Sequence, residues 1–313
     1  MRQLLRSASR VKEAHGFGKA RFFVTKYVQF YPMSKQWVSF IDDYCEHHLG
    51  APAPVEMIRT KFMRRFYSRK VGAAQRLKLL QSHYQVLETH LRSDIIGRLL
   101  GGEALTLGEL SGKSGTQYAF SVAVHDRYRY EGDLTLFMHR AADNQLLAAL
   151  TFSLGFAAHQ TIEMRIGGLQ GPAGEDAKQI VVDVTRDLHG LRPKNAVLDV
   201  FYDLAEVLQA ATIEAVGMAN HPLNDRGHAV VCNNDVFWEE NGALRGRDGN
   251  YRLPRVRAVK TLEEVAAKKR KDWLARRGHK AALKAQLVPI AQSWLRFHVT
   301  PVDAAEPAIR AVA

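Results

Sequence analysis

Cysteine is scarce in this chain, with two residues, Cys45 and Cys232, among 313. Two cysteines exclude a disulfide framework and predict a protein of a reducing compartment. The longest mostly apolar stretch, Leu146–Ala158, is shorter than the roughly 20 residues that a membrane-spanning helix needs. The first thirty residues are rich in Lys and Arg and have no apolar block, which argues against a secretory signal. We therefore expect a cytoplasmic protein without a transmembrane segment.

Familiar catalytic and metal-binding motifs are also missing. The chain has no Gly-x-Ser-x-Gly nucleophile motif and no Walker phosphate-binding loop. Its histidines, including the neighbours His47 and His48, have no metal-ligand spacing, and no cysteine pairs with them. The sequence therefore predicts no metal site.

Charge is plentiful and unevenly distributed, within a net charge of +12. Residues 1–100 hold 18 Lys and Arg against 7 Asp and Glu, and residues 261–313 hold 10 against 5. The intervening residues 101–260 hold 16 against 20. Two basic ends flanking an acidic middle predict an anionic partner, either nucleic acid, anionic lipid or a polyphosphate-bearing substrate. The alternative interpretation is that the basic residues form solvated helix faces with no partner.

Hydrophobic periodicity divides the chain into three predicted domains. Residues 1–102 have helical spacing and form a basic N-terminal region, and residues 259–313 form a basic helical C-terminal tail. Residues 103–258 form the core domain, in which alternating apolar runs are separated by short turns. This pattern is typical of an antiparallel meander. Its runs lie at 118–124, 134–138, 146–154 and 161–166.

Later segments predict crossing helices and two more strands. We expect a helix over Glu175–Leu188, a helix beginning at Pro193, and strands over Ile213–Met218 and Val230–Trp238. In the tail, Thr261–Glu264 is a capping box that predicts a helix start. A second tail helix is expected over 281–297, interrupted near Pro289. The predicted fold class is α/β, with a mostly antiparallel sheet and crossing helices.

A glycine-rich loop, Gly167–Gly174, follows a predicted strand and precedes a predicted helix. Backbone N–H groups at a helix N-terminus attract phosphate, so Gly168, Gln170, Gly171 and Gly174 are candidate cofactor-binding residues. The order is similar to the acyl-CoA pyrophosphate loop of GCN5-related N-acetyltransferases, although the spacing from Gln170 differs from that family's. The alternative interpretation is a tight turn that needs glycine backbone angles.

A histidine and several cations gather in the segment 185–194. His189 is a candidate general base, because histidine titrates near neutral pH. Arg186, Arg192 and Lys194 are candidate ligands for a phosphate or carboxylate. The alternative is a helix C-cap in which Gly190 adopts the left-handed conformation.

Acidic residues gather in the segment 233–241. Asp235 and Glu239 are candidate catalytic residues that, with Glu240, could orient a base or bind an amine. The neighbouring aromatic residues Phe237 and Trp238 are expected to close the core rather than stack on a ligand.

Three stretches together resemble the VirK/YbjX family. They are Ile166–Gly171, Thr185–Lys194, and Asp235–Glu240 with Tyr251–Pro254. The chain departs at Asn233–Asn234, where that family commonly has an acidic and an aromatic residue. The resemblance implies a domain of unknown biochemical function. It also implies association with virulence, surface-protein display, envelope stress, resistance to cationic antimicrobial peptides and the response to DNA damage. It provides no catalytic residues.

Three functions follow as hypotheses. The first is an acyl- or aminoacyl-transferase-like enzyme with an acetyltransferase-like core, which uses an acyl-CoA or another phosphate-bearing acyl donor. The second is a non-enzymatic envelope-associated factor, whose basic ends bind an anionic membrane surface or an envelope protein. This protein would be peripheral at the inner membrane. The third, ranked lowest for want of a recognisable motif, is nucleic-acid binding.

Overall fold

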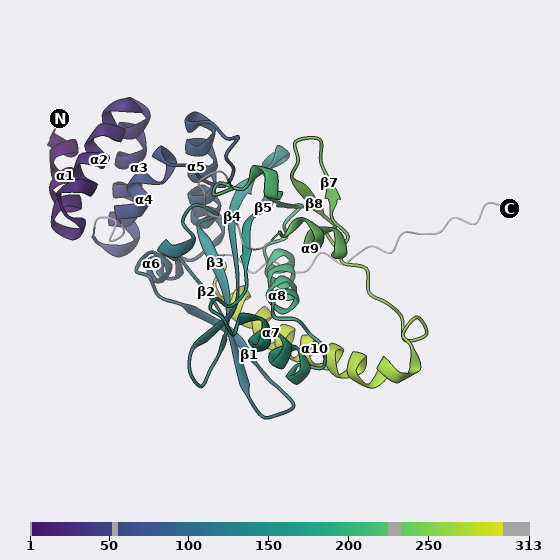
Figure 1. Ribbon diagram of the computed structural model, residues 1–313. Coiled ribbons are helices and arrows are strands. Elements are labelled where there is room, and N and C mark those ends of the chain that lie inside the picture. Colours follow the sequence, from purple (N-terminus) through teal and green to yellow (C-terminus); the bar gives the residue numbers. More distant parts are fainter. Residues whose placement is uncertain (1, 52–55, 225–232, 297–313) are drawn as a thin grey trace.

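The computed structural model describes residues 2–51, 56–224 and 233–296. A block of helices comes first, as the apolar periodicity of the first hundred residues predicts (Figure 1). These helices are α1 (Arg2–His15), α2 (Phe17–Gln29), α3 (Met33–Leu49), α4 (Glu56–Thr60), α5 (Ala73–His90) and α6 (Ser93–Leu100). Aromatic side chains fill the space between them. Trp37 is fully buried, and its ring lies 5.8 Å from that of Tyr84 on α5.

The middle of the chain forms an eight-stranded sheet in the order β1-β2-β3-β4-β5-β6-β8-β7. Every neighbouring pair is antiparallel except β5 and β6, which are parallel. The predicted meander and the α/β fold class are confirmed, and β1 is an additional strand. The strands are β1 (Leu105–Ser111), β2 (Gln117–Ala123), β3 (Leu134–Arg140), β4 (Gln145–Phe156), β5 (Ile162–Gln170), β6 (Thr212–Ala215), β7 (Leu244–Arg245) and β8 (Tyr251–Leu253).

Helices cover the two faces of this sheet. Figure 1 shows the sheet between α5 and the later helices, and α5 and α8 both contact the long strand β4. On the α8 face the Phe152 and Phe201 rings lie 5.3 Å apart. On the α5 face, the Leu154 N–H donates to Nδ1 of the buried His83. The later helices are α7 (Ala177–Asp187), α8 (Pro193–Val207), α9 (Asp235–Glu240) and α10 (Arg270–Ser293).

A buried ion pair attaches the helical block to the sheet. Lys61 Nζ lies 2.6 Å from Asp133 Oδ1 and also donates to the Gly132 carbonyl, and Ser153 donates to the second carboxylate oxygen of Asp133. Burial alone would raise the pKa of Asp133, but Lys61, His83 and Ser153 together hold it below its usual value. These bonds fix the segment just before β3, which carries part of the site described below.

Two predictions from the later part of the chain are wrong. The segment around 235 is a helix, α9, rather than a strand over Val230–Trp238, of which residues 230–232 lie outside the described residues. The physical reason is its pattern of burial. Trp238 is buried and Val236 is exposed, so the apolar contact lies on one side of a helical turn.

The tail has one long helix in place of the two predicted. The Thr261 N–H does donate to Glu264, as in a capping box, but α10 starts later, at Arg270. Pro289 lies inside this helix, although proline removes a backbone donor. Leu283, Leu287 and Ala291 recur every four residues and are all buried, so packing of this face keeps the helix continuous.

One hydrophobic core runs through all three predicted domains. It includes Trp37 of α3, Phe120 of β2 and Leu287 of α10. The division at 102 and 258 falls between elements and stays a prediction. Among the residues that the structure describes, no helix combines the length and the apolar character needed to cross a membrane.

Candidate functional site

The parallel strands β5 and β6 separate part-way along their length. They are paired over Glu163–Ile166, and the last link is the Val216 N–H donating to the Ile166 carbonyl at 2.9 Å. Beyond it β5 continues to Gln170 with β4 alone. The hydrogen-bonded pairing of the two strands therefore ends at their carboxyl ends, where open α/β sheets commonly bind ligands.

Two glycines let another segment lie directly against β5 beyond this point. Gly167 is the extra residue of a β-bulge opposite β4. A Cβ atom on Gly167 would lie 1.6 Å from the Glu131 carbonyl oxygen, and one on Gly168 would lie 1.9 Å from Glu131 Oε2. Only glycine permits so close an approach. The structure thus shows a role for these two glycines other than phosphate binding: they allow Glu131 to pack against β5.

Glu131 forms a buried cluster with His221 and Gln170. Gln170 Nε2 donates to Glu131 Oε1 at 2.9 Å, and His221 Nε2 lies 3.2 Å from the same oxygen. The side chains of Glu131 and His221 are 5% and 7% exposed. Within the described part of the chain, the other carboxylate oxygen, Oε2, has no hydrogen-bond partner.

The hydrogen bonds of His221 fix its tautomer. Its Nδ1 accepts the backbone N–H of Leu223 at 3.3 Å, so the proton of the neutral ring is carried by Nε2, which faces Glu131. Glu131 therefore accepts from two donors through Oε1, while its buried Oε2 has no described hydrogen-bond partner. A buried carboxylate oxygen with this support is suited to accept a proton from a bound reactant.

The segment around 235 bridges the two separated strands. Asn234 Nδ2 donates to the Leu169 carbonyl on β5, and Asp235 Oδ1 accepts the Met218 N–H just after β6. Lys194 Nζ donates to Asn234 Oδ1 at 2.9 Å. Its Cε lies 4.0 Å from where a Cβ of Gly171 would be, beside the glycine-rich loop.

The structure thus brings together part of the predicted site. Gly168, Gln170 and Gly171 lie with Lys194 and Asp235 near the point where β5 and β6 part, as the contacts above describe. Gly174 lies on the way to α7, has a φ of +101°, and has open space where a Cβ would be. The predicted roles of these residues stay predictions.

The other predicted residues face different neighbours. His189 points to α10, where its Nδ1 lies 3.1 Å from Asp272 Oδ1 and its ring lies 5.1 Å from that of His279. The turn is a helix C-cap with Gly190 at a φ of +84°, the alternative that the sequence left open. Glu239 accepts the hydroxyl of Tyr251.

Two predicted cations lie largely in solvent. Arg186 is 74% exposed beside Asp183, and Arg192 is 62% exposed with its Nη1 3.5 Å from Glu240. Exposed pairs of this kind are screened by water and contribute little. Their predicted role in cofactor binding stays a prediction, with no described contact that favours it.

A polar cavity of about 340 Å³ lies on the α5 side of β5 and β6. At its wall, Glu214 Oε1 accepts from the Tyr67 hydroxyl and from Asn250 Nδ2, each at 2.9 Å. Burial raises the pKa of Glu214 above its usual value. The Tyr67 N–H donates to the carbonyl of Tyr130, the residue before Glu131, so a lining residue of the cavity is bonded to the segment that carries the buried cluster. Its lining also includes Glu163, Arg165, Asn220 and Asp248.

Sequence reasoning missed Glu131 and His221. Glu131 stands in a Glu-Gly turn between two strands, and His221 follows a short helical turn with no pattern around it. The one available signal was the pair Gly167-Gly168 inside a strand, since a glycine in a strand often marks a bulge or a close approach by another backbone.

The family model described as "Protein of unknown function (DUF535)" matches residues 14–278. This is an α/β protein with a buried carboxylate–histidine cluster where two parallel strands part, and the chain belongs to that family. The uncharacterized protein YbjX of Escherichia coli K12 is 30% identical over 230 residues, covering 72% of this chain and 69% of that protein. The expected resemblance to the VirK/YbjX family is confirmed.

Two further matches are more distant. An uncharacterized protein of Haemophilus influenzae is 24% identical over 216 residues, covering 67% of this chain and 69% of that one. Among solved structures, a cAMP-binding acyltransferase from Mycobacterium smegmatis gives a TM-score of 0.29 at 10% identity. That match covers 70% of this chain and 64% of the solved chain.

Proposed function

We propose that this protein is an acyltransferase that uses a phosphate-bearing thioester, such as an acyl-CoA, as donor. The observation that carries the proposal is the buried Glu131–His221 pair at the point where β5 and β6 part. A pair of this kind provides a base inside the protein, and in the proposed reaction the reacting group approaches it where the strands part.

The glycine-rich loop and Lys194 would hold the donor's phosphates. The loop leads into α7, an eleven-residue helix whose N-terminus carries a partial positive charge. Lys194 adds a full charge beside Gly171, on the same side as the bridging Asn234. We therefore propose Lys194 as the anchoring cation, rather than Arg186 or Arg192, which are mostly exposed.

The acceptor would enter through the polar cavity. Its size is in the range of small-molecule sites, and its charged lining suits a polar amine or hydroxyl compound. The acceptor's nitrogen or oxygen attacks the thioester carbonyl while its proton passes to Glu131 Oε2. The carbon–sulfur bond then breaks, and the thiolate takes up a proton from solvent. His221 and Gln170 position the carboxylate through Oε1.

Calorimetry with acetyl-CoA and a longer-chain acyl-CoA tests the donor site. We expect micromolar binding by the wild type and at least about tenfold weaker binding by Lys194→Ala, because a charge-assisted contact to phosphate is lost. Lys35→Ala, which removes an exposed lysine of α3, is the matched control and should bind as the wild type does. Absence of thioester binding, or equal affinity for both lysine variants, would overturn the proposal.

A second candidate function rests on the start of α10. The run Lys268–Lys271 is exposed there, and Leu274, three residues further along α10, is 53% exposed. Figure 1 shows this end of α10 extending away from the sheet. Basic and apolar side chains exposed together suit a peripheral contact with anionic lipid, each basic residue contributing about 1 kcal/mol.

Co-sedimentation with vesicles tests the second candidate. Binding should require phosphatidylserine, fall at high salt, and weaken when Lys268, Lys269 and Lys271 are all changed to Gln. Binding that ignores lipid charge, salt and these substitutions would exclude this interpretation. Such binding would not bear on the acyl-donor site.

A further inference from the structure

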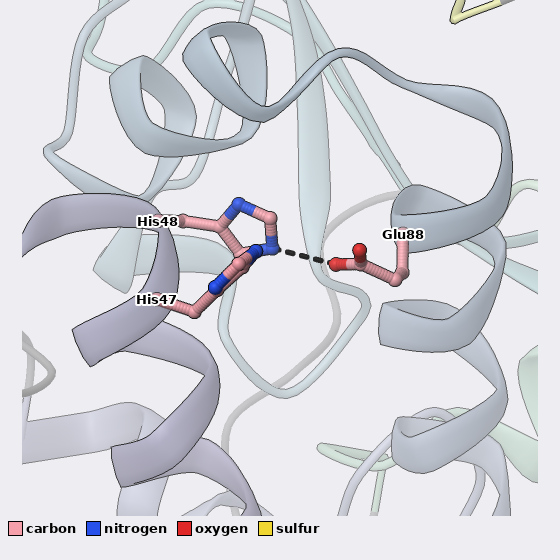
Figure 2. Close-up of side chains that lie close together, drawn as sticks. All are labelled: His47, His48 and Glu88. Atoms are coloured by element: carbon pink, nitrogen blue, oxygen red, sulfur yellow. Dashed lines mark hydrogen bonds and ion pairs between the residues drawn. The ribbon is translucent and has the colours of Figure 1, made fainter.

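Two histidines at the end of α3 face a carboxylate near the end of α5. One ligand atom from each of His47, His48 and Glu88 lies within 4.8 Å of the other two. Figure 2 shows His48 and Glu88 pointing toward each other from the two helices, with His47 beside them. His48 Nε2 lies 2.6 Å from Glu88 Oε2. The three residues are remote from the proposed acyltransferase site in sequence and come from the helical block.

Neighbouring side chains already orient two of these ligands. Ser93, the first residue of α6, has its Oγ 2.7 Å from His48 Nδ1, and Arg296 donates to Glu88 Oε1 at 2.8 Å. A hydrogen bond on one ring nitrogen fixes the direction of the other, and metal-ligating histidines commonly have such a partner. Nε2 of His48 and Oε2 of Glu88 are thus the atoms that face the cluster.

The ends of two helices make the location favourable for a cation. His47 and His48 stand in the last turn of α3, and Glu88 lies two residues before the end of α5. A helix C-terminus carries a partial negative charge, so two such ends attract a positive ion. Arg296 opposes this attraction but occupies Oε1, and leaves the facing oxygen to the ion.

We propose that His47, His48 and Glu88 bind one divalent ion of the Zn²⁺ class and so clamp α3 to α5. Two imidazoles and one carboxylate are a zinc-type ligand set, and water would complete four-coordination. With bonds of about 2.0–2.1 Å, tetrahedral ligand atoms lie about 3.3 Å apart. When the ion binds, the 2.6 Å distance between His48 and Glu88 therefore lengthens and the longer distances shorten. The exposed His47 side chain turns toward the other two ligands.

Sequence spacing gave no sign of this site, and the reason is geometric. Adjacent histidines do not point in one direction on a helix, so His47 and His48 have none of the usual ligand intervals. Their third partner stands 40 residues beyond His48, on a different helix. The prediction of no metal site rested on local spacing and on the lack of a cysteine that pairs with the histidines, and neither can detect ligands that the packing of helices brings together.

Calorimetry with zinc chloride on the chelator-treated full chain tests the proposal. We expect one ion per chain and at least about tenfold weaker binding by His47→Ala and by Glu88→Gln. His47 is exposed, so its removal leaves the packing intact. The matched control is His159→Asn, which removes an exposed histidine at a φ of 58°, a backbone angle that asparagine tolerates. This control should bind zinc as the wild type does.

Two further measurements report on the site itself. Cobalt should give the visible absorption of a tetrahedral ion in the wild type and not in His47→Ala. Zinc should raise the melting temperature of the wild type and of His159→Asn, but not of His47→Ala, because it binds the folded site. Zinc uptake that is equal in all variants, or absent at micromolar concentration, would overturn the proposal. Thioester binding is measured separately, so failure here leaves the acyltransferase proposal intact.

Discussion

Two histidine–carboxylate pairs in this protein have nearly the same geometry and very different surroundings. His221 lies 3.2 Å from Glu131, and His189 lies 3.1 Å from Asp272. In the first pair both side chains are at most 7% exposed, whereas Asp272 is 52% exposed. The first pair sits where two strands part, and the second joins a helix cap to α10.

The difference lies in what water does to each pair. Around Asp272 solvent screens the interaction, so the pair contributes little to stability or chemistry. Around Glu131 there is little solvent, and a carboxylate oxygen without a described partner is costly to keep there. Proteins retain such groups mainly where they are used, so the buried pair is the better candidate for chemistry.

Substituting one residue of each pair should give the largest difference in rate between the two. Glu131→Gln keeps acceptance from Gln170 and His221 but loses the base. We expect it to reduce thiol release from an acyl-CoA, with polar amines as acceptors, by about 10²–10⁴-fold. His189→Ala should change the rate less than about twofold. The measurement is the initial rate at saturating donor. An equal loss of rate in the two variants would favour the catalytic role of His189 that the sequence predicts.

A third histidine, His83, extends the comparison to pH. It is fully buried against β4, and burial lowers its pKa from 6.5 to about 4. In the unfolded chain it takes up a proton near pH 6.5, which the folded chain does not do until about pH 4. Stability is therefore lost as pH falls through this window, by at most about 3 kcal/mol.

Urea unfolding between pH 4 and 7.5 measures this effect. His83→Asn, which keeps an acceptor for the Leu154 N–H, should flatten the dependence of the free energy of unfolding on pH. A slope that His83→Asn does not change would place the acid-sensitive group elsewhere.

The sequence predicted the fold better than the site, and the two outcomes have one cause. Alternation over residues 118–166 reports local backbone geometry, so the meander and the antiparallel direction of its strands could be predicted. Helical spacing did the same for α5 and α8. Glu131 and His221 are 90 residues apart and meet only through the bulge at Gly167, which no local pattern encodes.

Local motifs also leave the function open where one pattern suits several functions. The His189–Lys194 segment concentrates titratable groups, yet Gly190 and Pro193 serve a helix end and a helix start. Of the three cations in this segment, Lys194 is the one that lies beside the loop. It follows Pro193 at the start of α8, and its Nζ donates to Asn234. Which of the three cations lies there depends on packing between α8 and α9, which composition does not reveal.

Glycine substitutions beside the two pairs should have the smallest effects, and these effects should differ between the buried pair and the exposed pair. In Gly167→Ala the new Cβ meets the Glu131 backbone, which cannot rotate away, so we expect a loss of about 2 kcal/mol in unfolding free energy. In Gly190→Ala the new Cβ would lie 2.8 Å from Arg276 Nη1, which is the flexible end of a side chain. Only the left-handed backbone is then penalised, by about 1 kcal/mol.

Activity separates these two variants further than stability does. Gly167→Ala displaces Glu131 and should lower the rate of acyl transfer as well as the unfolding free energy. Gly190→Ala loosens a cap that holds no proposed catalytic group, and should leave that rate unchanged. Urea unfolding and initial rates, measured on the same preparations, decide the matter. A rate that falls with Gly190→Ala and survives Gly167→Ala would mean that the exposed pair, rather than the buried one, performs the chemistry.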